Sequence, residues 1–268
     1  MSALSFLIEE ISSKQRKGLL GDGVCFRGQH ANQTLVPRLL RPGRKFKYSI
    51  DYTENMLFCD AWVMGATELA GIRNSWEALA LFQHFEIPTR LLDWSSSLPS
   101  ALFFAVQKCL RCDKQGKCEK LRKSCDGNPV IWVLDSKKMH EKLHAGKRAG
   151  LLSAITIGVD QVQDYKEEFV IKEASTNSWD YKAGPVFLEV PWTNARIRSQ
   201  KGFFTFHCDN NPLENILDET SGLIKIELGK KHRSTIVEEF NAIGLTEHGI
   251  FTDLVSLANY FKRRYTTA

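Results

Sequence analysis

The sequence predicts an α+β fold with a mixed or antiparallel central sheet and flanking helices. Helical patterns at both ends frame several short segments rich in β-branched and aromatic residues. The chain has 268 residues, 43% hydrophobic and 25% charged, which is a normal globular balance with enough apolar residues for a sizeable core. Internal repeats and long low-complexity linkers are missing from the sequence. A single domain over residues 1–268 is therefore expected.

Helical patterns account for most of the first 110 residues. Apolar residues recur at helical spacing over Leu4–Lys17, and Gly18 is expected to end that helix. Val24–Arg27 is a short strand candidate that runs into Gly28, where a backbone without Cβ allows close approach of a ligand or another strand. Further helices are expected at Asp51–Gly71, at Trp76–Phe85 and from Leu98 to Cys109, with Pro99 in the first turn.

The later chain alternates short strands with helices. Thr235 and Glu238 match a capping box, which predicts a helix that starts there and ends at Gly244. A last helix is expected to start near Asp253. The strand candidates are Val130–Leu134, Val186–Val190, Phe203–His207 and Leu223–Leu228.

The N-terminal segment and the hydropathy pattern predict a cytoplasmic protein. Every apolar run is shorter than the roughly 18 residues of a membrane span. Glu9 and Glu10 interrupt the one N-terminal candidate for a signal sequence. We therefore expect no membrane partner, and thiols or metal ligands rather than disulfides from the seven cysteines.

Four of these cysteines form a cluster with the spacing C-x2-C-x5-C-x6-C in a polar segment, residues 109–127. Four thiolates around Zn²⁺ would make a small structural clip, and the surrounding lysines and arginines would offset its negative charge. The alternative is a set of unligated or redox-active thiols. The remaining Cys25, Cys59 and Cys208 are expected to be small hydrophobic residues. The cluster consists of Cys109, Cys112, Cys118 and Cys125.

The sequence His140-Glu141-Lys142-Leu143-His144 matches the H-E-x-x-H motif of zinc metalloproteases. The surrounding segment is short, rich in lysine and stops at Gly146, whereas such a site normally lies on a buried helix. We therefore expect a solvated helix with two surface histidines.

The segment Gln83–Trp94 is the strongest candidate for a functional site. Pro88 ends the preceding helix and starts an extended segment. Arg90 and Asp93 then occur among apolar residues that would otherwise form an ordinary buried strand. Burying an unpaired charge costs several kcal/mol (order of magnitude), so these two groups should be paired or should face a cavity.

Five cations fall in a stretch from Ala31 to Ile50 that contains no acidic residue. The stretch is either a solvated basic loop or a surface for phosphate and nucleic acid, with Phe46 and Tyr48 available for stacking. The cations are Arg38, Arg41, Arg44, Lys45 and Lys47.

Several sequence blocks resemble the FRG domain family. The first are Phe26–Gln29, which reads FRGQ, Pro37–Arg41, and the Gln83–Phe85 triplet that leads into Pro88–Trp94, which reads PTRLLDW. The resemblance runs from about Val24 to Arg264, and the cysteine cluster looks like an insertion between family blocks. The later blocks are Ala101–Ala105, Arg198–Phe204 and Gly249–Leu254.

The order of these blocks is similar to that of the ADP-ribosyltransferase fold. This resemblance implies a bacterial effector that uses NAD as a substrate to modify a macromolecule, protein or nucleic acid, in a toxin or phage-defence setting. It implies that Arg27 binds the dinucleotide phosphates, Gln200 contacts the ribose, and Thr89 or Ser95 supplies a supporting hydroxyl. Gly28, Gln29 and Arg90 are further cofactor-binding candidates, and His84 and Asp93 join Arg27 and Gln200 as catalytic candidates.

An amide at Gln200 cannot supply negative charge to a cationic centre, so Asp93 or Glu189 would have to do so. Three alternatives remain open at this point. Arg27, Arg90, Asp93 and Gln200 could form one structural network without a substrate. The chain could be a nucleic-acid-binding or nucleic-acid-cleaving module, or a protein-interaction domain without catalysis.

Overall fold

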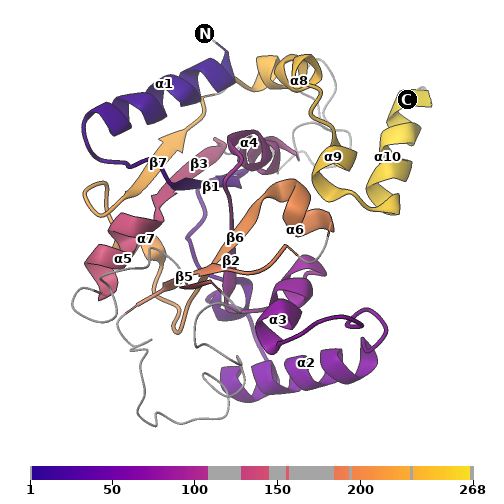
Figure 1. Ribbon diagram of the computed structural model, residues 1–268. Helices are drawn as coiled ribbons and strands as arrows, with labels where there is room; N and C mark the ends of the chain where they lie inside the picture. The colour runs from indigo at the N-terminus through magenta and orange to yellow at the C-terminus, as the bar shows by residue number, and fades with distance from the viewer. Residues whose placement is uncertain are drawn as a thin grey trace.

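A computed structural model describes residues 2–107, 128–144, 155–156, 184–192, 195–229 and 232–265. Helices cover both faces of a seven-stranded sheet with the order β4-β5-β6-β2-β1-β3-β7 (Figure 1). Neighbouring strands are antiparallel except β4, which runs parallel to β5. The predicted α+β class is confirmed. Among the described residues, no helix is long and apolar enough to span a membrane.

The strands agree closely with the segments predicted from periodicity. Two-residue β4 is the exception, because so short a segment carries no periodic signal. The strands are β1 (Val24–Gln29), β2 (Leu91–Ser95), β3 (Val130–Asp135), β4 (Ile155–Thr156), β5 (Val186–Glu189), β6 (Gly202–Phe206) and β7 (Leu223–Glu227).

The long helices also lie near their predicted positions. Short α6, α7 and α9 and the 3₁₀ turn η1 were not predicted, since none exceeds six residues. The helices are α1 (Ala3–Arg16), η1 (Arg38–Leu40), α2 (Ile50–Met64), α3 (Ser75–His84), α4 (Leu98–Val106), α5 (Ser136–His144), α6 (Ala195–Gln200), α7 (Leu213–Ile216), α8 (Arg233–Ala242), α9 (Glu247–Phe251) and α10 (Leu254–Tyr265).

Two predicted helix boundaries are wrong. The second helix ends at Met64 rather than at Gly71, because Gly65, a poor helix former, takes the C-cap position. Thr235 does not cap α8, which starts at Arg233. Its hydroxyl instead donates to the main-chain oxygen of His232 at 3.2 Å.

The two helices nearest the site have clear starting signals in the sequence. Asn74 caps α3, with its side-chain oxygen accepting a hydrogen bond from the Glu77 N–H. Ser97 caps α4 in the same way through the Ser100 N–H, and Pro99 lies in the first turn as predicted.

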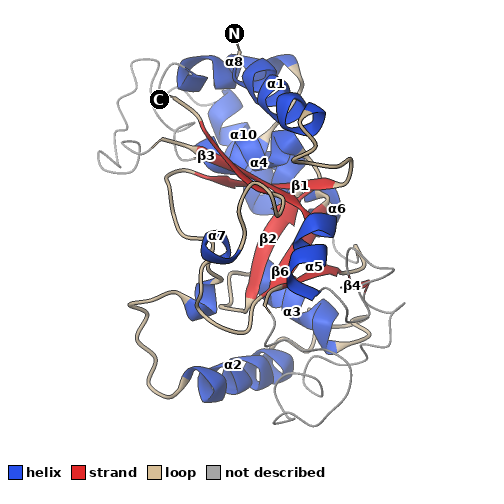
Figure 2. Ribbon diagram, turned by 90° about the vertical axis from the view of Figure 1, so that its left-hand side faces the viewer, coloured by secondary structure: helices blue, strands red, loops and turns tan. Residues whose placement is uncertain are grey.

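The sheet is nearly divided between β1 and β2. Their register contains a single pair, Phe26 opposite Ser95. By contrast, β1 pairs with β3 over six positions, and β2 pairs with β6 over five. Figure 2 shows β2 running down the molecule while β1 and β3 cross its upper part. The strands therefore separate beyond Phe26, and backbone groups of Arg27 and Gly28 are not paired with β2.

Different helices cover the two halves of one face of the sheet. Helices α1, α4 and α8 pack over β1, β3 and β7, while α2 and α3 pack over β2, β5 and β6. The opposite face is closed by a third cluster that includes Trp94, Trp132 and residues from α5 and α7. The two helical layers on the first face thus meet above the separation between β1 and β2.

The H-E-x-x-H segment forms helix α5, but its first histidine is not at the surface. His140 is 5% exposed, so the expectation of two surface histidines is wrong for this residue. Met139 beside it is fully buried, which shows that this side of α5 packs on the sheet. The described residues contain no group of three potential ligands for a metal ion.

Candidate functional site

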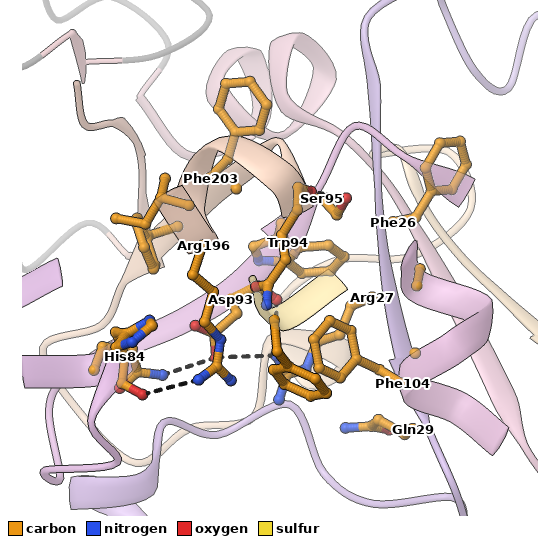
Figure 3. A pocket seen from close by; sticks show the side chains of 18 of the residues that line it. Phe26, Arg27, Gln29, His84, Asp93, Trp94, Ser95, Phe104, Arg196 and Phe203 are labelled. Atoms are coloured by element: carbon orange, nitrogen blue, oxygen red, sulfur yellow. Dashed lines mark hydrogen bonds and ion pairs between the residues drawn. The ribbon is translucent and has the colours of Figure 1, made fainter. Parts of the chain in front are cut away.

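A pocket of about 350 Å³ opens where β1 and β2 separate. Its walls come from β1, β2, β6 and the helices α3, α4, α6 and α9, so the chain assembles it from segments far apart in sequence (Figure 3). Of the predicted site residues, the pocket brings together Arg27, Gly28, Gln29, His84, Asp93 and Gln200. It also includes Ser95. Thr89, Arg90 and Glu189 are not part of its lining.

Gly28 allows α4 to lie directly on β1. A Cβ at this position would be 1.7 Å from the main-chain oxygen of Ala101 and 2.7 Å from the nitrogen of Ala105. Both contacts are with backbone, which cannot rotate away as a side chain could. The glycine of the F-R-G block is therefore required for strand–helix packing, and this packing sets one wall of the pocket.

Arg27 bridges the two separated strands. Its Nη1 donates a hydrogen bond of 2.7 Å to the main-chain oxygen of Asp93 and lies 3.6 Å from the Asp93 Oδ2. The side chain is only 15% exposed, and its Nε is buried without a hydrogen-bond partner. Burial lowers the pKa of the guanidinium, and the Asp93 carboxylate offsets part of that shift. Arginine stays charged under such shifts, so Arg27 is a buried cation with an unused donor.

A chain of hydrogen bonds fixes the carboxylate of Asp93. The Thr89 hydroxyl donates to Gln83 Oε1 at 2.6 Å, and Gln83 Nε2 donates to Asp93 Oδ2 at 2.8 Å. Thr89 is 2% exposed and lies outside the pocket. Its hydroxyl therefore orients Gln83, which in turn orients the carboxylate. Asp93 itself is 54% exposed, so one oxygen atom remains accessible from the pocket.

The end of α3 supplies a histidine and a strained glutamate. Burial lowers the pKa of His84 to about 4, with a further contribution from the cation Arg196, so the imidazole is neutral near pH 7. Its Nδ1 is buried and has no hydrogen-bond partner. Glu86 adopts a left-handed backbone conformation with φ 65° and pairs with Arg38 at 3.3 Å. These contacts bring η1 to the pocket wall.

Arg196 is a site residue that the sequence did not indicate. Its guanidinium lies 4.5 Å from the ring centre of Phe251 and donates to the main-chain oxygen of His84 at 3.3 Å. In Figure 3 it points toward the region of Asp93 and His84. Burial lowers its pKa, while Asp93 and other carboxylates raise it. Helix α6 has only six residues and carries a second arginine, Arg198, so no sequence pattern would have singled out Arg196.

Gln200 lies in the pocket, and its side-chain nitrogen already forms a hydrogen bond within the protein. Its Nε2 donates to the main-chain oxygen of Ile250 at 3.3 Å, and its own main-chain oxygen accepts a bond from the Ser95 hydroxyl. These bonds tie the last turn of α6 to β2 and to α9. Gln200 is therefore a wall residue whose side-chain oxygen remains available to a ligand hydroxyl.

Arg90 is paired, as expected for a charge among apolar residues, but its partner is not Asp93. Its Nε and Nη2 form ion pairs of 2.7 Å with Glu54 and Asp51 of α2, and its Nη1 donates to the Cys208 main-chain oxygen. Because Arg90 immediately precedes β2, it anchors α2 to the sheet. The single network of Arg27, Arg90, Asp93 and Gln200 is consequently not formed.

His207 is a buried neighbour of Arg27 on the face opposite α3. Its Nε2 lies 2.9 Å from the Thr205 hydroxyl, which also accepts a hydrogen bond of 3.0 Å from the indole of Trp94. Burial and the charge of Arg27 lower its pKa to about 3. A neutral imidazole here leaves the positive charge of Arg27 unopposed on that side.

The pocket lining is rich in groups that recognise nucleotides. Three guanidinium groups face two carboxylates, which gives a net charge of +1 when the histidines are neutral. Five glutamines and six aromatic residues complete the polar and flat surfaces. Guanidinium groups bind phosphate, aromatic rings stack on bases, and amides pair with base edges. The aromatic residues are Phe26, Trp94, Phe104, Phe203, Phe204 and Phe251.

The structure describes the three cysteines that were expected to be small hydrophobic residues. Cys25 is 5% exposed, and burial raises the pKa of its thiol to about 12, so it is a small core residue. Burial raises the pKa of Cys208 to about 12 as well, and this residue and Cys59 are half-buried. The predicted zinc ligands Cys109, Cys112, Cys118 and Cys125 lie outside the described residues.

The later sequence blocks converge on the same pocket. Arg198–Phe204 supplies Gln200 and two aromatic rings of its lining, and Gly249–Leu254 supplies Phe251. Comparison with protein families finds a match to the FRG domain at residues 22–114, which spans β1, β2, α3 and α4. No curated protein and no solved structure matches the chain. The blocks Arg198–Phe204 and Gly249–Leu254 lie outside this match. The chain thus carries an FRG domain at residues 22–114, which confirms the family resemblance for the sequence blocks in that range.

Proposed function

We propose that the protein is an ADP-ribosyltransferase-like enzyme that binds NAD in the pocket between β1 and β2. One observation carries this proposal: the separation of the strands places a buried cation, Arg27, beside an accessible and oriented carboxylate, Asp93. A nucleotide with a diphosphate needs the cation, and a reaction through a cationic ribosyl centre needs the carboxylate.

The lining fits the parts of NAD. Arg27 has an unpartnered Nε, and Arg196 has no carboxylate within ion-pair distance among the described residues, so both can donate to phosphate oxygens. Phe104 and Phe251 offer ring faces or edges to a base. The volume lies within the usual range of about 300–1,000 Å³ for small-molecule sites.

The proposed reaction cleaves the bond between the nicotinamide nitrogen and ribose C1′. The bonding electron pair leaves with nicotinamide, and a lone pair of the acceptor atom forms the new bond to C1′, after which the acceptor loses its proton. Positive charge develops on the ribose during this exchange. The Asp93 carboxylate, held by Gln83, would stabilise that charge, whereas the amide of Gln200 could only hydrogen-bond a ribose hydroxyl.

Gln83 and Thr89 then act as positioning residues. Their hydrogen bonds of 2.8 and 2.6 Å hold Asp93 in one orientation before substrate arrives. His84, neutral near pH 7, can accept or donate a single hydrogen bond through its buried Nδ1. We place the enzyme in the bacterial cytoplasm, acting on a macromolecule in a toxin or phage-defence setting.

Calorimetric titration with NAD tests the binding step. Arg27→Lys keeps the charge but removes the two-pronged donor, and we expect the Kd for NAD to rise about 10- to 100-fold, because hydrogen bonds to charged groups contribute about 1.5–3 kcal/mol. Arg16→Ala is the matched control, since Arg16 forms only a surface pair with Glu9. Thermal unfolding of each variant must show an intact fold. Equal NAD affinity in folded Arg27→Lys and wild type would contradict the assignment.

A further inference from the structure

The loop that leads into α2 is basic, aromatic and exposed. We call residues Arg41–Tyr48 the basic loop. Four of its side chains are cations, all exposed, and Tyr48 is 54% exposed. Figure 2 shows the loop that enters α2 standing out from the body of the molecule. The cations are Arg41, Arg44, Lys45 and Lys47.

Among the residues that the structure describes, no carboxylate forms an ion pair with a cation of this loop. The stretch from Ala31 to Ile50 has no acid, and the first acids after it, Asp51 and Glu54, form ion pairs with Arg90. The loop cations therefore present their charge to solvent. Exposed like charges repel one another unless a polyanion is bound.

The loop is locally organised. Pro42 and Gly43 occupy the centre of a turn in which the Arg44 N–H donates to the Arg41 main-chain oxygen at 3.4 Å, and the φ of 83° at Gly43 suits a type II turn. Lys47 lies 5.4 Å from the ring centre of Tyr48, whose ring meets that of Tyr52 edge-on at 5.0 Å. Cations alternating with exposed aromatic rings are the surface that single-stranded nucleic acid prefers.

The basic loop is continuous with the pocket. Arg38, three residues before the loop, lines the pocket and pairs with Glu86. Arg41 is close enough to Arg27 and Asp93 for their charges to act on one another. Lys47 lies six positions after Arg41 in the chain, a reach of at most about 20 Å. A bound strand of a few nucleotides could therefore extend from the loop to the pocket mouth.

We infer that the macromolecular acceptor is single-stranded nucleic acid, docked through its phosphates on Arg44, Lys45 and Lys47 and by base stacking on Tyr48. This inference rests on the proposed function for the chemical step, although docking itself does not need NAD. In that step ribose C1′ leaves the nicotinamide nitrogen, which takes the bonding pair. A base nitrogen or sugar hydroxyl of the strand forms the new bond and loses a proton to solvent.

Fluorescence anisotropy with a labelled strand of about 12 nucleotides, made as RNA and as DNA, measures docking. With three phosphate contacts, affinity should fall about 20-fold when salt rises about four-fold. The variant Arg44→Gln/Lys45→Gln/Lys47→Gln should lose most of the binding and of the salt dependence. Tyr48→Ala should weaken binding about 10-fold, while Tyr48→Phe retains it. Comparison of the affinities for the RNA strand and the DNA strand shows which of the two is preferred.

The matched control removes the same charge elsewhere, as Lys17→Gln/Lys137→Gln/Lys142→Gln, three exposed lysines of α1 and α5 regions. Labelled NAD is then added to each protein with the strand and with a bacterial lysate. Label on the strand that is lost in the loop variant, while NAD binding stays unchanged, supports the inference.

Three results would overturn it. The labelled strand could fail to bind the wild-type protein, or the loop variant could bind the strand as well as the control variant does. Alternatively, label from NAD could pass to lysate protein equally with the loop variant and with the control variant. Failure to bind NAD combined with normal strand binding would refute the proposed function, and with it the acceptor role, while the loop would remain a docking surface. The two failures are thus distinguishable.

Discussion

Arg27 donates a hydrogen bond of 2.7 Å to the main-chain oxygen of Asp93, across strands that pair only at Phe26 and Ser95. Continuing that register would place Gly28 opposite Asp93. The guanidinium therefore takes the place of a backbone ladder bond, and the sheet opens there without leaving the Asp93 carbonyl unsatisfied. The same bond brings the carboxylate of Asp93 and the charge of Arg27 to one pocket.

Substitution of Gly28 tests the packing of α4 on β1. Gly28→Ala would place a methyl group 1.7 Å from the Ala101 oxygen, so the helix must move away from the strand. We expect the free energy of unfolding to fall by about 3 kcal/mol. Gly23→Ala is the matched control, because a Cβ there has no neighbour within 4 Å, and its effect should stay within about 1 kcal/mol. Denaturant unfolding measures both, and equal effects would contradict the packing.

The left-handed conformation of Glu86 predicts a stabilising substitution. Glu86→Gly removes the strain of a side chain at φ 65°, and the free energy of unfolding should rise by about 0.5–1 kcal/mol. Glu86→Gln keeps the strain and loses only the partly exposed pair with Arg38, so its effect should stay below about 1 kcal/mol. Denaturant unfolding of the two variants separates backbone from charge. Equal stability of both would show that no strain is stored at this residue.

Buried His207 and half-buried His84 predict loss of stability in mild acid. The folded pKa of His84 is about 4 and that of His207 about 3, both below the ordinary 6.5. The unfolded chain therefore binds more protons in this range, and stability is full above pH 6.5 and falls as pH drops toward those folded values. His207→Gln should flatten the dependence of unfolding free energy on pH between 6.5 and 4. An unchanged slope in this variant would mean that His207 is not buried neutral.

The cysteine cluster stays a prediction from the sequence. Metal analysis of the purified chain should return about one zinc per molecule if the four thiolates form a structural site. Cys112→Ser should abolish this content, whereas Cys59→Ser should not, since Cys59 lies on α2 outside the cluster. Absence of zinc from protein prepared without chelator would leave the cluster as free thiols.

Much of the fold follows from local signals in the sequence. Strands β3, β5, β6 and β7 are β-branched and aromatic runs, and α3 and α4 begin at clear caps, so periodicity and capping identify them. The capping-box prediction at Thr235 failed because an alternative start two residues earlier competes with it. Helices of six residues or fewer, such as α6, are fixed by tertiary contacts that no local pattern records.

Site residues were predictable where they belong to one of the recognised sequence blocks. Arg27, His84 and Asp93 belong to the F-R-G and Q-H-F…L-L-D-W blocks, and all three line the pocket. Arg196 and Glu86 were missed, because the first depends on the approach of α9 and the second on an αL conformation that its residue type disfavours. The partners of Arg90 could not be predicted, because Asp51 and Glu54 on α2 lie more than 35 residues earlier in the chain.

The most direct test of the central claim is nicotinamide release from labelled NAD by the purified protein with a bacterial lysate, compared with Asp93→Asn and with Arg16→Ala as control. The proposed function predicts release and label transfer by wild type and control. It predicts a loss of about 100-fold or more in Asp93→Asn, in which the fold is retained but the negative charge is gone. Release that is absent from folded wild-type protein, or unchanged in Asp93→Asn, would contradict it.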